Sequence, residues 1–237
     1  MIDFHSHFLP EMDDGSTSVS ESVQMLELSF DMGIDTIIST SHYYSNYESI
    51  DEFVGRRAVK LQKLMLVLEG ISNVPLLVMG AEVAFFPGMS GVKELPRLNI
   101  ENTKYMLLEM PFEKWSSLNM REVRSLITNR GITPIIAHIE RYFPYQQRKS
   151  DIEELLDLGV AVQTNAEALI EGSQKRNILK LLDSGKIHLL GSDCHNMVER
   201  RPNLDSAVKI IETNIGASCI ERINLVGQRI LSSVEVT

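Results

Sequence analysis

Seven short, nearly continuous apolar runs recur along the 237-residue chain and alternate with stretches of helical pattern. The runs cover residues 1–5, 35–40, 75–82, 104–110, 132–140, 160–165 and 187–193. Strands that are buried on both faces of a parallel sheet are apolar throughout, whereas strands with one solvent-facing side alternate between apolar and polar residues. The runs therefore predict parallel strands that are connected by helices.

Amphipathic helices are expected between most of these strands. In the first helix, Ser18 and Glu21 have the spacing of a capping box, and Gly33 ends the helix. Further helices are expected at residues 51–69, 119–130, 151–158, 174–185 and in the tail from about 203 to 232. Repeated strand–helix units predict an α/β fold whose parallel sheet closes into a barrel. An open doubly wound sheet is the alternative, although no glycine-rich phosphate loop follows any of the runs.

The net charge, the N-terminal sequence and the lengths of the apolar runs limit the partners and the location that we expect for this protein. The formal net charge is −9, which argues against a nucleic-acid partner and against an anionic membrane surface, since both need basic patches. The start "MIDFHSH" lacks the features of a signal peptide, and no apolar run approaches the roughly 20 residues that span a bilayer. Cys194 and Cys219 are far apart and fit a reducing compartment. We therefore expect a cytoplasmic protein without membrane insertion; the sequence gives no clear oligomeric state.

Histidines and carboxylates gather where the expected strands end. Five of the six histidines lie at or just past the C-terminal end of a run, namely His5, His7, His42, His138 and His195. Carboxylates occupy matching places: Asp13, Asp14, Glu82, Glu109 and Asp193. The sixth histidine, His188, stands at a strand start, and we interpret it as a packing or capping residue.

The C-terminal ends of the strands of a parallel barrel meet at one face, where barrel enzymes carry out their chemistry. Histidine and carboxylate ligands without thiolates suit Mn, Fe or Zn. In a regular strand, His5 and His7 would point to the same face and could chelate one ion. A single histidine at a strand end is more often structural than a ligand, but the joint pattern outweighs that interpretation and predicts a metal centre.

The motifs that carry these residues resemble those of the polymerase-and-histidinol-phosphatase (PHP) superfamily. They are "DFHSHFLPEMDDG", "STSHY", "GAEV", "LLEMPF", "PIIAHIERY" and "GSDCHN", and they occur in this order between residue 1 and about residue 205. Among its branches, the chain most resembles the bacterial metal-dependent protein tyrosine phosphatases that regulate capsule and exopolysaccharide synthesis. The resemblance implies a distorted, TIM-like (β/α)7 barrel as a single domain over residues 1–237, with the helices of about 203–232 packed on the barrel.

The resemblance also implies three divalent metal ions, most often Mn, with Fe or Zn as alternatives. His5, His7, Glu82 and Asp193 would hold the first ion. Glu82 would bridge to a second ion held with Glu109 and His138, and Asp14, His42 and His195 would hold the third. In the histidinol phosphatase branch the places of Asp14 and Glu109 tend to carry histidine, so the carboxylates here favour the tyrosine phosphatase branch.

Two arginines are expected to bind phosphate. Arg141 in "HIERY" matches the family pattern directly, whereas "HNMVERRPN" offers Arg200 by counting from His195 and Arg201 by its neighbouring proline. We favour Arg201 and keep Arg200 open. The implied reaction is hydrolysis of phosphotyrosine by a hydroxide that bridges two metals, since metal binding brings the pKa of water to about 7 in favourable sites. Asp14 or a metal-bound water would be the general acid, and the expected partner is a phosphotyrosine protein such as a bacterial tyrosine kinase.

Several features of the sequence bear on competing interpretations. Cys194 to Arg200 has the C-x5-R spacing of cysteine-based tyrosine phosphatases, but the intervening residues contain no glycine and Asp193 and His195 are better used as ligands. A small-molecule phosphatase such as a histidinol-phosphate phosphatase would share the metal site. A nuclease conflicts with the acidic balance, and an inactive binding module would not need nine competent ligands. Aromatic residues near the expected mouth either line a substrate cleft or anchor loops; these are Tyr43, Tyr44, Tyr47, Phe112, Trp115, Tyr142 and Phe143.

Overall fold

Strands form at all seven apolar runs, and two of the strands continue after a short break. The computed structural model describes residues 1–146 and 149–233. Its strands are β1 (Ile2–Ser6), β2 (Thr36–Ser39), β3 (His42–Tyr43), β4 (Leu76–Met79), β5 (Glu82–Ala84), β6 (Tyr105–Glu109), β7 (Thr133–Ile136), β8 (Ala161–Asn165) and β9 (Leu189–Gly191). Every paired strand is parallel to its neighbour, as the continuous apolar runs predict.

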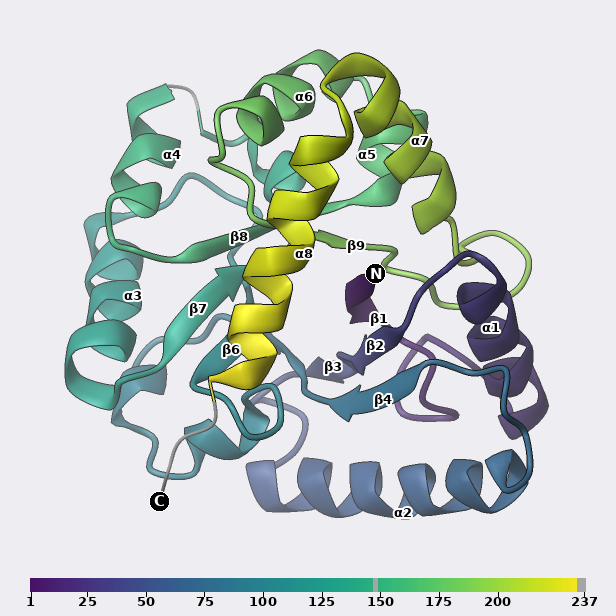
Figure 1. Cartoon of the computed structure of the whole chain (residues 1–237). Helices are drawn as coiled ribbons and strands as arrows, with labels where there is room; N and C mark the ends of the chain where they lie inside the picture. Colours follow the sequence, from purple (N-terminus) through teal and green to yellow (C-terminus); the bar gives the residue numbers. More distant parts are fainter. Residues whose placement is uncertain (147–148, 234–237) are drawn as a thin grey trace.

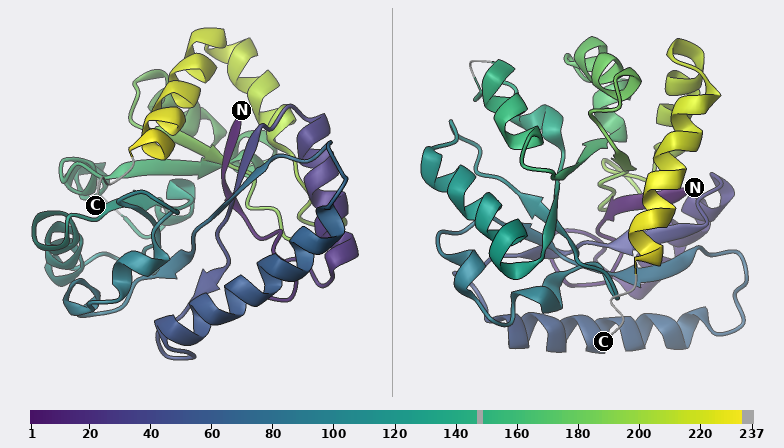
Figure 2. Two further views of the ribbon diagram at one scale, coloured as in Figure 1. Left: turned by 60° about the horizontal axis from the view of Figure 1, so that its bottom comes forward. Right: turned by 60° about the vertical axis from the view of Figure 1, so that its left-hand side comes forward.

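The strands form one curled barrel with seven strand positions, two of which hold two short consecutive strands each. Hydrogen bonding gives the orders β1-β2-β4 and β3-β5-β6-β7-β8-β9. Because β3 continues β2 and β5 continues β4, these two sheets are parts of one seven-strand series. The series closes where Ser6 bridges Cys194 and the amide of His7 donates to the carbonyl of Cys194 at 2.8 Å. The predicted α/β barrel is confirmed, and its helices lie around the outside of the curled sheet (Figures 1 and 2).

Helices cover the barrel between the strands. They are α1 (Val19–Asp31), α2 (Ile50–Leu68), α3 (Ser117–Arg130), α4 (Lys149–Leu156), α5 (Ala166–Ile170), α6 (Lys175–Asp183), α7 (Leu204–Asn214) and α8 (Ala217–Ser232). Short 3-10 helices occur at η1 (Met89–Gly91), η2 (Leu95–Leu98) and η3 (Ile139–Tyr142). The short helix α5 follows β8 directly and is not predicted by the sequence pattern. The expected helical tail is divided at Gly216, whose φ of 117° is in the region that favours glycine.

The start of α1 differs in detail from the predicted capping box. Ser18 caps the helix by accepting from the amide of Glu21, as predicted. The Glu21 carboxylate, however, accepts from the amide and hydroxyl of Thr17, both at 2.9 Å, and not from the amide of Ser18. Only half of the box therefore forms. Gly33 follows the helix end with a φ of 81°, which agrees with its predicted role as a terminator.

The interior of the barrel has an apolar layer, the lower layer, toward the N-terminal ends of the strands. Inward-facing side chains from six strands form a separate core cluster, and they are Phe4, Ile38, Leu107, Ile135, Ala161 and Leu189. Helix α8 closes the barrel at this end and adds Ile230 to the cluster (Figure 1). Gly227 of α8 makes this close approach possible, because a Cβ there would lie 2.7 Å from Cε2 of Phe4. A second, larger core lies between the barrel and its surrounding helices.

Side chains alternate along a strand with a period of two, so the inward positions one step further along form a second layer. Leu107 is followed by Glu109, Ala161 by Gln163, and Leu189 by Gly191. This second layer is polar and lies at the C-terminal ends of the strands. Within the described part of the chain, no helix is both long and apolar enough to cross a membrane.

Candidate metal centre

All nine predicted ligands converge at the C-terminal ends of the strands. Their ligand atoms form three groups, two of which share His7, and within each group the atoms lie within 4.8 Å of one another. The groups are His7, Asp14, His42 and His195 (the His7–His195 cluster), His5, His7 and Asp193 (the His5–Asp193 cluster), and Glu82, Glu109 and His138 (the Glu82–His138 cluster). Residues separated by up to 190 positions in the sequence are thus brought to one mouth by the barrel.

Glu82 lies at the centre of the site, where it links the clusters. Its Oε2 atom is 3.1 Å from Nε2 of His5 and 3.0 Å from Nδ1 of His42. Its Oε1 atom is 2.8 Å from Nε2 of His138. The carboxylate is almost fully buried at the start of β5. Glu82 thus contacts one histidine from each of the three clusters.

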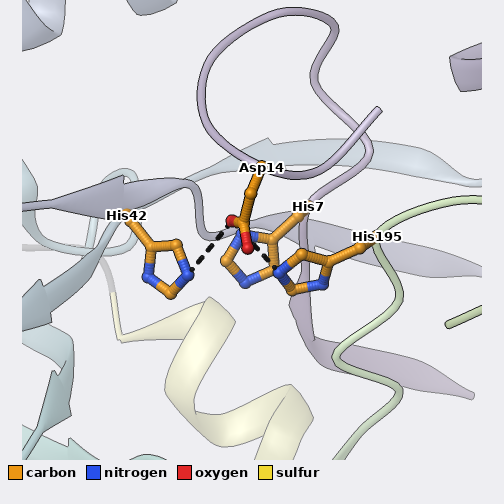
Figure 3. Close-up of side chains that lie close together, drawn as sticks. All are labelled: His7, Asp14, His42 and His195. Carbon is orange, nitrogen blue, oxygen red and sulfur yellow. Dashed lines mark ion pairs between the residues drawn. The ribbon is translucent and has the colours of Figure 1, made fainter. Parts of the chain in front are cut away.

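The His7–His195 cluster forms the outer part of the site (Figure 3). Asp14 reaches it from the loop after β1, and its Oδ1 atom is 3.5 Å from Nε2 of both His42 and His195. Asp14 is 67% exposed, whereas His195 is buried. The expected third group contained Asp14, His42 and His195; the structure adds His7, whose ring stacks on that of His195 with centroids 3.9 Å apart.

The histidines and carboxylates shift one another's pKa values strongly. Burial lowers the pKa of His7, but the carboxylates of Asp13 and Glu82 outweigh burial and raise it to about 10. His138 responds in the same way to Glu109 and Glu82, and its pKa rises to about 9. Burial raises the pKa of Glu82, but the surrounding histidines hold it well below its usual range. In the metal-free protein His7 and His138 are therefore protonated at neutral pH, and both rings would release a proton on binding a metal ion.

Nε2 of His195 has the surroundings expected of a metal-ligating nitrogen. Burial and the neighbouring His7 lower the pKa of His195 to about 4, so its ring is neutral at pH 7. Its Nδ1 lies 2.9 Å from the carbonyl of Asp193, to which a protonated Nδ1 donates. Its buried Nε2 makes no hydrogen bond with any residue that the structure describes. An imidazole with one nitrogen fixed by a carbonyl and the other free in a ligand cluster is the arrangement of metal-binding histidines.

A second layer of polar side chains, which the sequence analysis did not assign, holds the ligands in place. Asp13 Oδ2 lies 2.8 Å from Nδ1 of His7 and accepts from the amide of His42, also at 2.8 Å. Gln163 accepts from the amide of His138 at 2.7 Å, and Asn165 donates to Oδ2 of Asp193 at 2.7 Å. The polar residues in "VAVQTN" are a signal for this layer, since Gln163 and Asn165 share a face with Ala161 and stand at the end of a fully buried strand.

Arg141 and Arg200 are the two arginines that contact the candidate ligands. Nη2 of each contacts Oδ2 of Asp193, at 2.5 Å for Arg141 and 2.7 Å for Arg200. Arg201 is exposed and makes no ion pair with a described residue. The geometry therefore favours Arg200, and the role of either arginine in phosphate binding stays a prediction. The turn explains the choice. Oδ1 of Asn196 accepts from the amides of residues 198, 199 and 200, and this turns Arg200 back toward the mouth.

The remaining sequence candidates have structural roles. Cys194 is fully buried, and burial raises the pKa of its thiol far above the ordinary value, so a nucleophilic thiolate is disfavoured. The arginine of the C-x5-R spacing, Arg200, pairs with Asp193. His188 accepts from the amide of Val162 at 3.1 Å and thus ties β8 to the start of β9, in agreement with its interpretation as a structural residue.

Comparisons with known proteins agree with this geometry. A family model described as capsular polysaccharide synthesis, CpsB/CapC, matches residues 1–231. The tyrosine-protein phosphatase YwqE of Bacillus subtilis is 30% identical over 222 residues, which cover 92% of this chain and 86% of YwqE. The tyrosine-protein phosphatase CpsB of Streptococcus pneumoniae is 29% identical over 232 residues, which cover 92% of each chain.

The fold matches that of solved relatives. A crystal structure described as that of YwqE from Bacillus subtilis and CpsB from Streptococcus pneumoniae, "unique metal-dependent tyrosine phosphatases", superposes with a TM-score of 0.85. That match has 28% sequence identity and covers 100% of this chain and 96% of the other. The predicted resemblance to the capsule-regulating tyrosine phosphatases is confirmed. The match over residues 1–231, together with the identity to YwqE, shows that this chain belongs to the CpsB/CapC family of capsular polysaccharide synthesis.

Proposed function

We propose that this protein is a metal-dependent protein tyrosine phosphatase that acts in capsule or exopolysaccharide synthesis. One observation carries the proposal: nine metal-ligand side chains and two arginines converge on one barrel mouth in a member of the CpsB/CapC family. The curated relatives are named tyrosine-protein phosphatases, and the solved relatives are described as metal-dependent.

The proposed ligands follow the three clusters. His5, His7, Glu82 and Asp193 would hold one ion, Glu82, Glu109 and His138 a second, and Asp14, His42 and His195 a third. His7 lies close enough to serve the third group as well. Nitrogen and oxygen donors without thiolates suit manganese, which we favour, with iron or zinc as alternatives. Divalent ions in such clusters lower the pKa of water toward neutrality and offset the charge of a phosphoryl group.

The side chains of this protein would bind and orient the phosphoryl group. The side chains of Arg141 and Arg200 are 41% and 39% exposed, and both guanidinium groups would donate to phosphoryl oxygens. Since both now contact one oxygen of Asp193, substrate binding would exchange this carboxylate for a phosphoryl oxygen. Asp14 stands at the exposed side of the site and is our candidate for moving a proton to the leaving oxygen. A phenolate, with an intrinsic pKa of about 10, needs less help than an alkoxide.

The partner and the location complete the proposal. We infer a phosphotyrosine protein as substrate, namely a bacterial tyrosine kinase of the same synthesis system, and a cytoplasmic location. Residues 1–237 would form a single catalytic domain.

Phosphate release from a phosphotyrosine peptide tests this function directly. Manganese-loaded protein should release phosphate, chelator-treated protein should not, and added manganese should restore the activity. His138→Ala should lower turnover by several orders of magnitude while the far-ultraviolet circular dichroism stays unchanged. Full activity after complete metal removal would contradict the proposed metal centre. Activity confined to histidinol phosphate would contradict the proposed substrate.

A further inference from the structure

The aromatic residues around the mouth divide into anchors and exposed rings. Tyr43, Trp115 and Tyr142 are buried and pack in the core, so they act as loop anchors. Phe112 is 43% exposed, although it is apolar and lies beside a charged cluster. Exposed large apolar side chains next to a binding site commonly contact a ligand. Core packing therefore does not explain why a phenylalanine stands at position 112.

The loop that carries Phe112 is held rigidly after the end of β6. The amide of Met110 donates to the hydroxyl of Tyr142 at 2.9 Å, and the side chain of Gln146 donates to the carbonyl of Glu113 at 2.9 Å. Trp115 adds a bond from its indole nitrogen to the carbonyl of Pro111 at 3.2 Å. A loop fixed on both sides of Phe112 presents this ring in one position before any ligand arrives, which lowers the entropic cost of binding.

The ring of Phe112 borders the proposed phosphoryl site. It lies nearly parallel to the ring of His138, with centroids 5.8 Å apart and an interplanar angle of 20°. Nε2 of His138 contacts both Glu82 and Glu109 of the Glu82–His138 cluster. The exposed part of Phe112 is therefore one ring away from the atoms that would hold the ions.

A second aromatic group stands on the other side of Glu82. Tyr44 follows β3, and its ring centroid is 5.4 Å from that of His42. In the sheet, β5 with Glu82 lies between β3, which Tyr44 follows, and β6, which precedes Phe112. Tyr47 packs edge-on against Tyr44 and is 80% exposed. Tyr44 and Tyr47 line a pocket together with Asp14 and His42, whereas Phe112 lies next to His138.

We propose that Phe112 contacts the phenyl ring of the bound substrate and thereby selects aryl over alkyl phosphomonoesters. This specificity role rests on the proposed function, which places a phosphoryl group between the ligand clusters and the two arginines, Arg141 and Arg200. Aromatic pairs with centroids 4.5–7 Å apart contribute beyond their buried area. A phosphoserine side chain has no ring, so it would leave Phe112 exposed to water.

Two phosphonates separate the contact with the ring from binding of the charged group. Phenylphosphonate and methylphosphonate share the charged group and differ in the ring. Their affinities for manganese-loaded protein are measured by calorimetry, with the single tryptophan, Trp115, as a fluorescent reporter of the loop. Phe112→Ala should weaken phenylphosphonate by about three- to tenfold, the range of one aromatic pair. Methylphosphonate affinity and bound metal per chain should stay unchanged.

Matched variants make the result specific to the ring. Phe112→Tyr should restore phenylphosphonate affinity, whereas Phe112→Leu should restore it only in part. Phe30→Ala is the control, since Phe30 on α1 has nearly the same exposure, 41%. Equal losses for both phosphonates, or lost metal, would show that Phe112 only supports His138 and would overturn the proposal. An unchanged preference for phenylphosphonate would also overturn it.

Failure of the proposed function gives a different result. Wild-type protein that shows the Phe112-dependent preference but releases no phosphate from a phosphotyrosine peptide would refute the proposed reaction and support the ring contact. Wild-type protein that hydrolyses the peptide, while Phe112→Ala keeps the phenyl preference, would refute the ring contact alone.

Discussion

Asp13 orients two candidate ligands with one carboxylate. Its Oδ2 contacts Nδ1 of His7 and the amide of His42, which leaves Nε2 of His7 facing the ligand clusters. Carboxylates that hold a ligating histidine typically change metal affinity by about 10- to 100-fold when replaced. We expect Asp13→Asn to weaken metal binding by this factor, as measured by titration with manganese.

The control for Asp13→Asn is Asp205→Asn on α7. The Asp205 carboxylate pairs with Lys209 at 2.8 Å on the outside of the barrel and contacts no candidate ligand. The Asp205→Asn substitution should leave the affinity for manganese unchanged. Unaltered affinity in Asp13→Asn would show that packing alone fixes the ring of His7.

Arg200 and Arg201 are neighbours in the sequence, but we expect their replacement by alanine to affect the phosphatase activity to very different extents. Arg200 contacts Asp193 at the mouth, whereas Arg201 is exposed and forms no ion pair with a described residue. Removing one donor to a charged transition state costs about 100- to 1,000-fold in turnover. Arg200→Ala should therefore lower kcat/KM for a phosphotyrosine peptide by about 100-fold or more. Arg201→Ala should stay within about twofold on the same principle, and the reverse order of effects would return the phosphate-binding role to Arg201.

At the level of single residues, the sequence identified ligands better than their supports. The gathering of the nine candidate ligands could be predicted because histidine and carboxylate are rare at the ends of apolar strands. Asp13 and Gln163 hold these ligands through hydrogen bonds whose partners are up to 29 and 158 positions away. Such contacts depend on barrel closure. The choice of Arg200 likewise depends on the turn around Asn196, which the neighbouring proline does not reveal.

Among the elements, β9 approaches β1 closely because Gly191 has no side chain. A Cβ at this position would lie 2.4 Å from Cβ of His5 and 2.6 Å from Nε2 of Gln163. Gly191→Ala should displace His5 and lower the free energy of unfolding by about 1–3 kcal/mol, the usual cost of overpacking. Metal bound per chain, measured by elemental analysis, should fall as well.

Gly55→Ala is the matched control for this substitution. Gly55 lies inside α2, where a Cβ would have no neighbour within 4 Å. Alanine is favoured over glycine in a helix by about 1 kcal/mol, so this variant should unfold at a slightly higher temperature and retain its metal. Full metal content in Gly191→Ala would show that the strands separate without moving His5.

The elements were predicted well where local pattern decides them. Helix α2 lies within one residue of its expected range, because Ser49 and Glu52 form a complete capping box at its start. The breaks between β2 and β3 and between β4 and β5 were not predicted. They arise where the chain turns its inward side chains toward the metal centre, and the continuous apolar pattern carries no signal for this bend. The division of the tail at Gly216 also depends on backbone conformation at one residue.

On the scale of the whole molecule, the barrel separates stability from chemistry. Its lower interior is apolar and closed by α8, while the upper interior is filled with charged ligands. The fold class could be predicted because seven apolar runs leave few topologies. Closure between β1 and β9 could not be derived from local pattern, since it joins residues 6 and 194.

This division makes the stability of the metal-free protein depend on pH. The folded-state pKa values of His7 and His138, about 10 and about 9, lie above the ordinary histidine value of about 6.5. Groups with raised pKa values stabilise the fold fully below the unfolded pKa, and this contribution is lost as pH rises through the folded pKa. His195, with a pKa of about 4, has the opposite effect, which is confined to pH values below about 6.5.

The melting temperature of chelated protein should therefore fall as pH rises from about 6.5 to about 8.5, within the window that these pKa values define. Metal binding needs deprotonated ligands, so the stabilisation by manganese should grow over the same range. Scanning calorimetry of chelated and manganese-saturated samples at both pH values measures the gap between their melting temperatures. A gap that widens with pH places His7 and His138 among the groups that exchange protons for metal. A gap that stays constant or narrows would mean that these histidines do not ligate the ions.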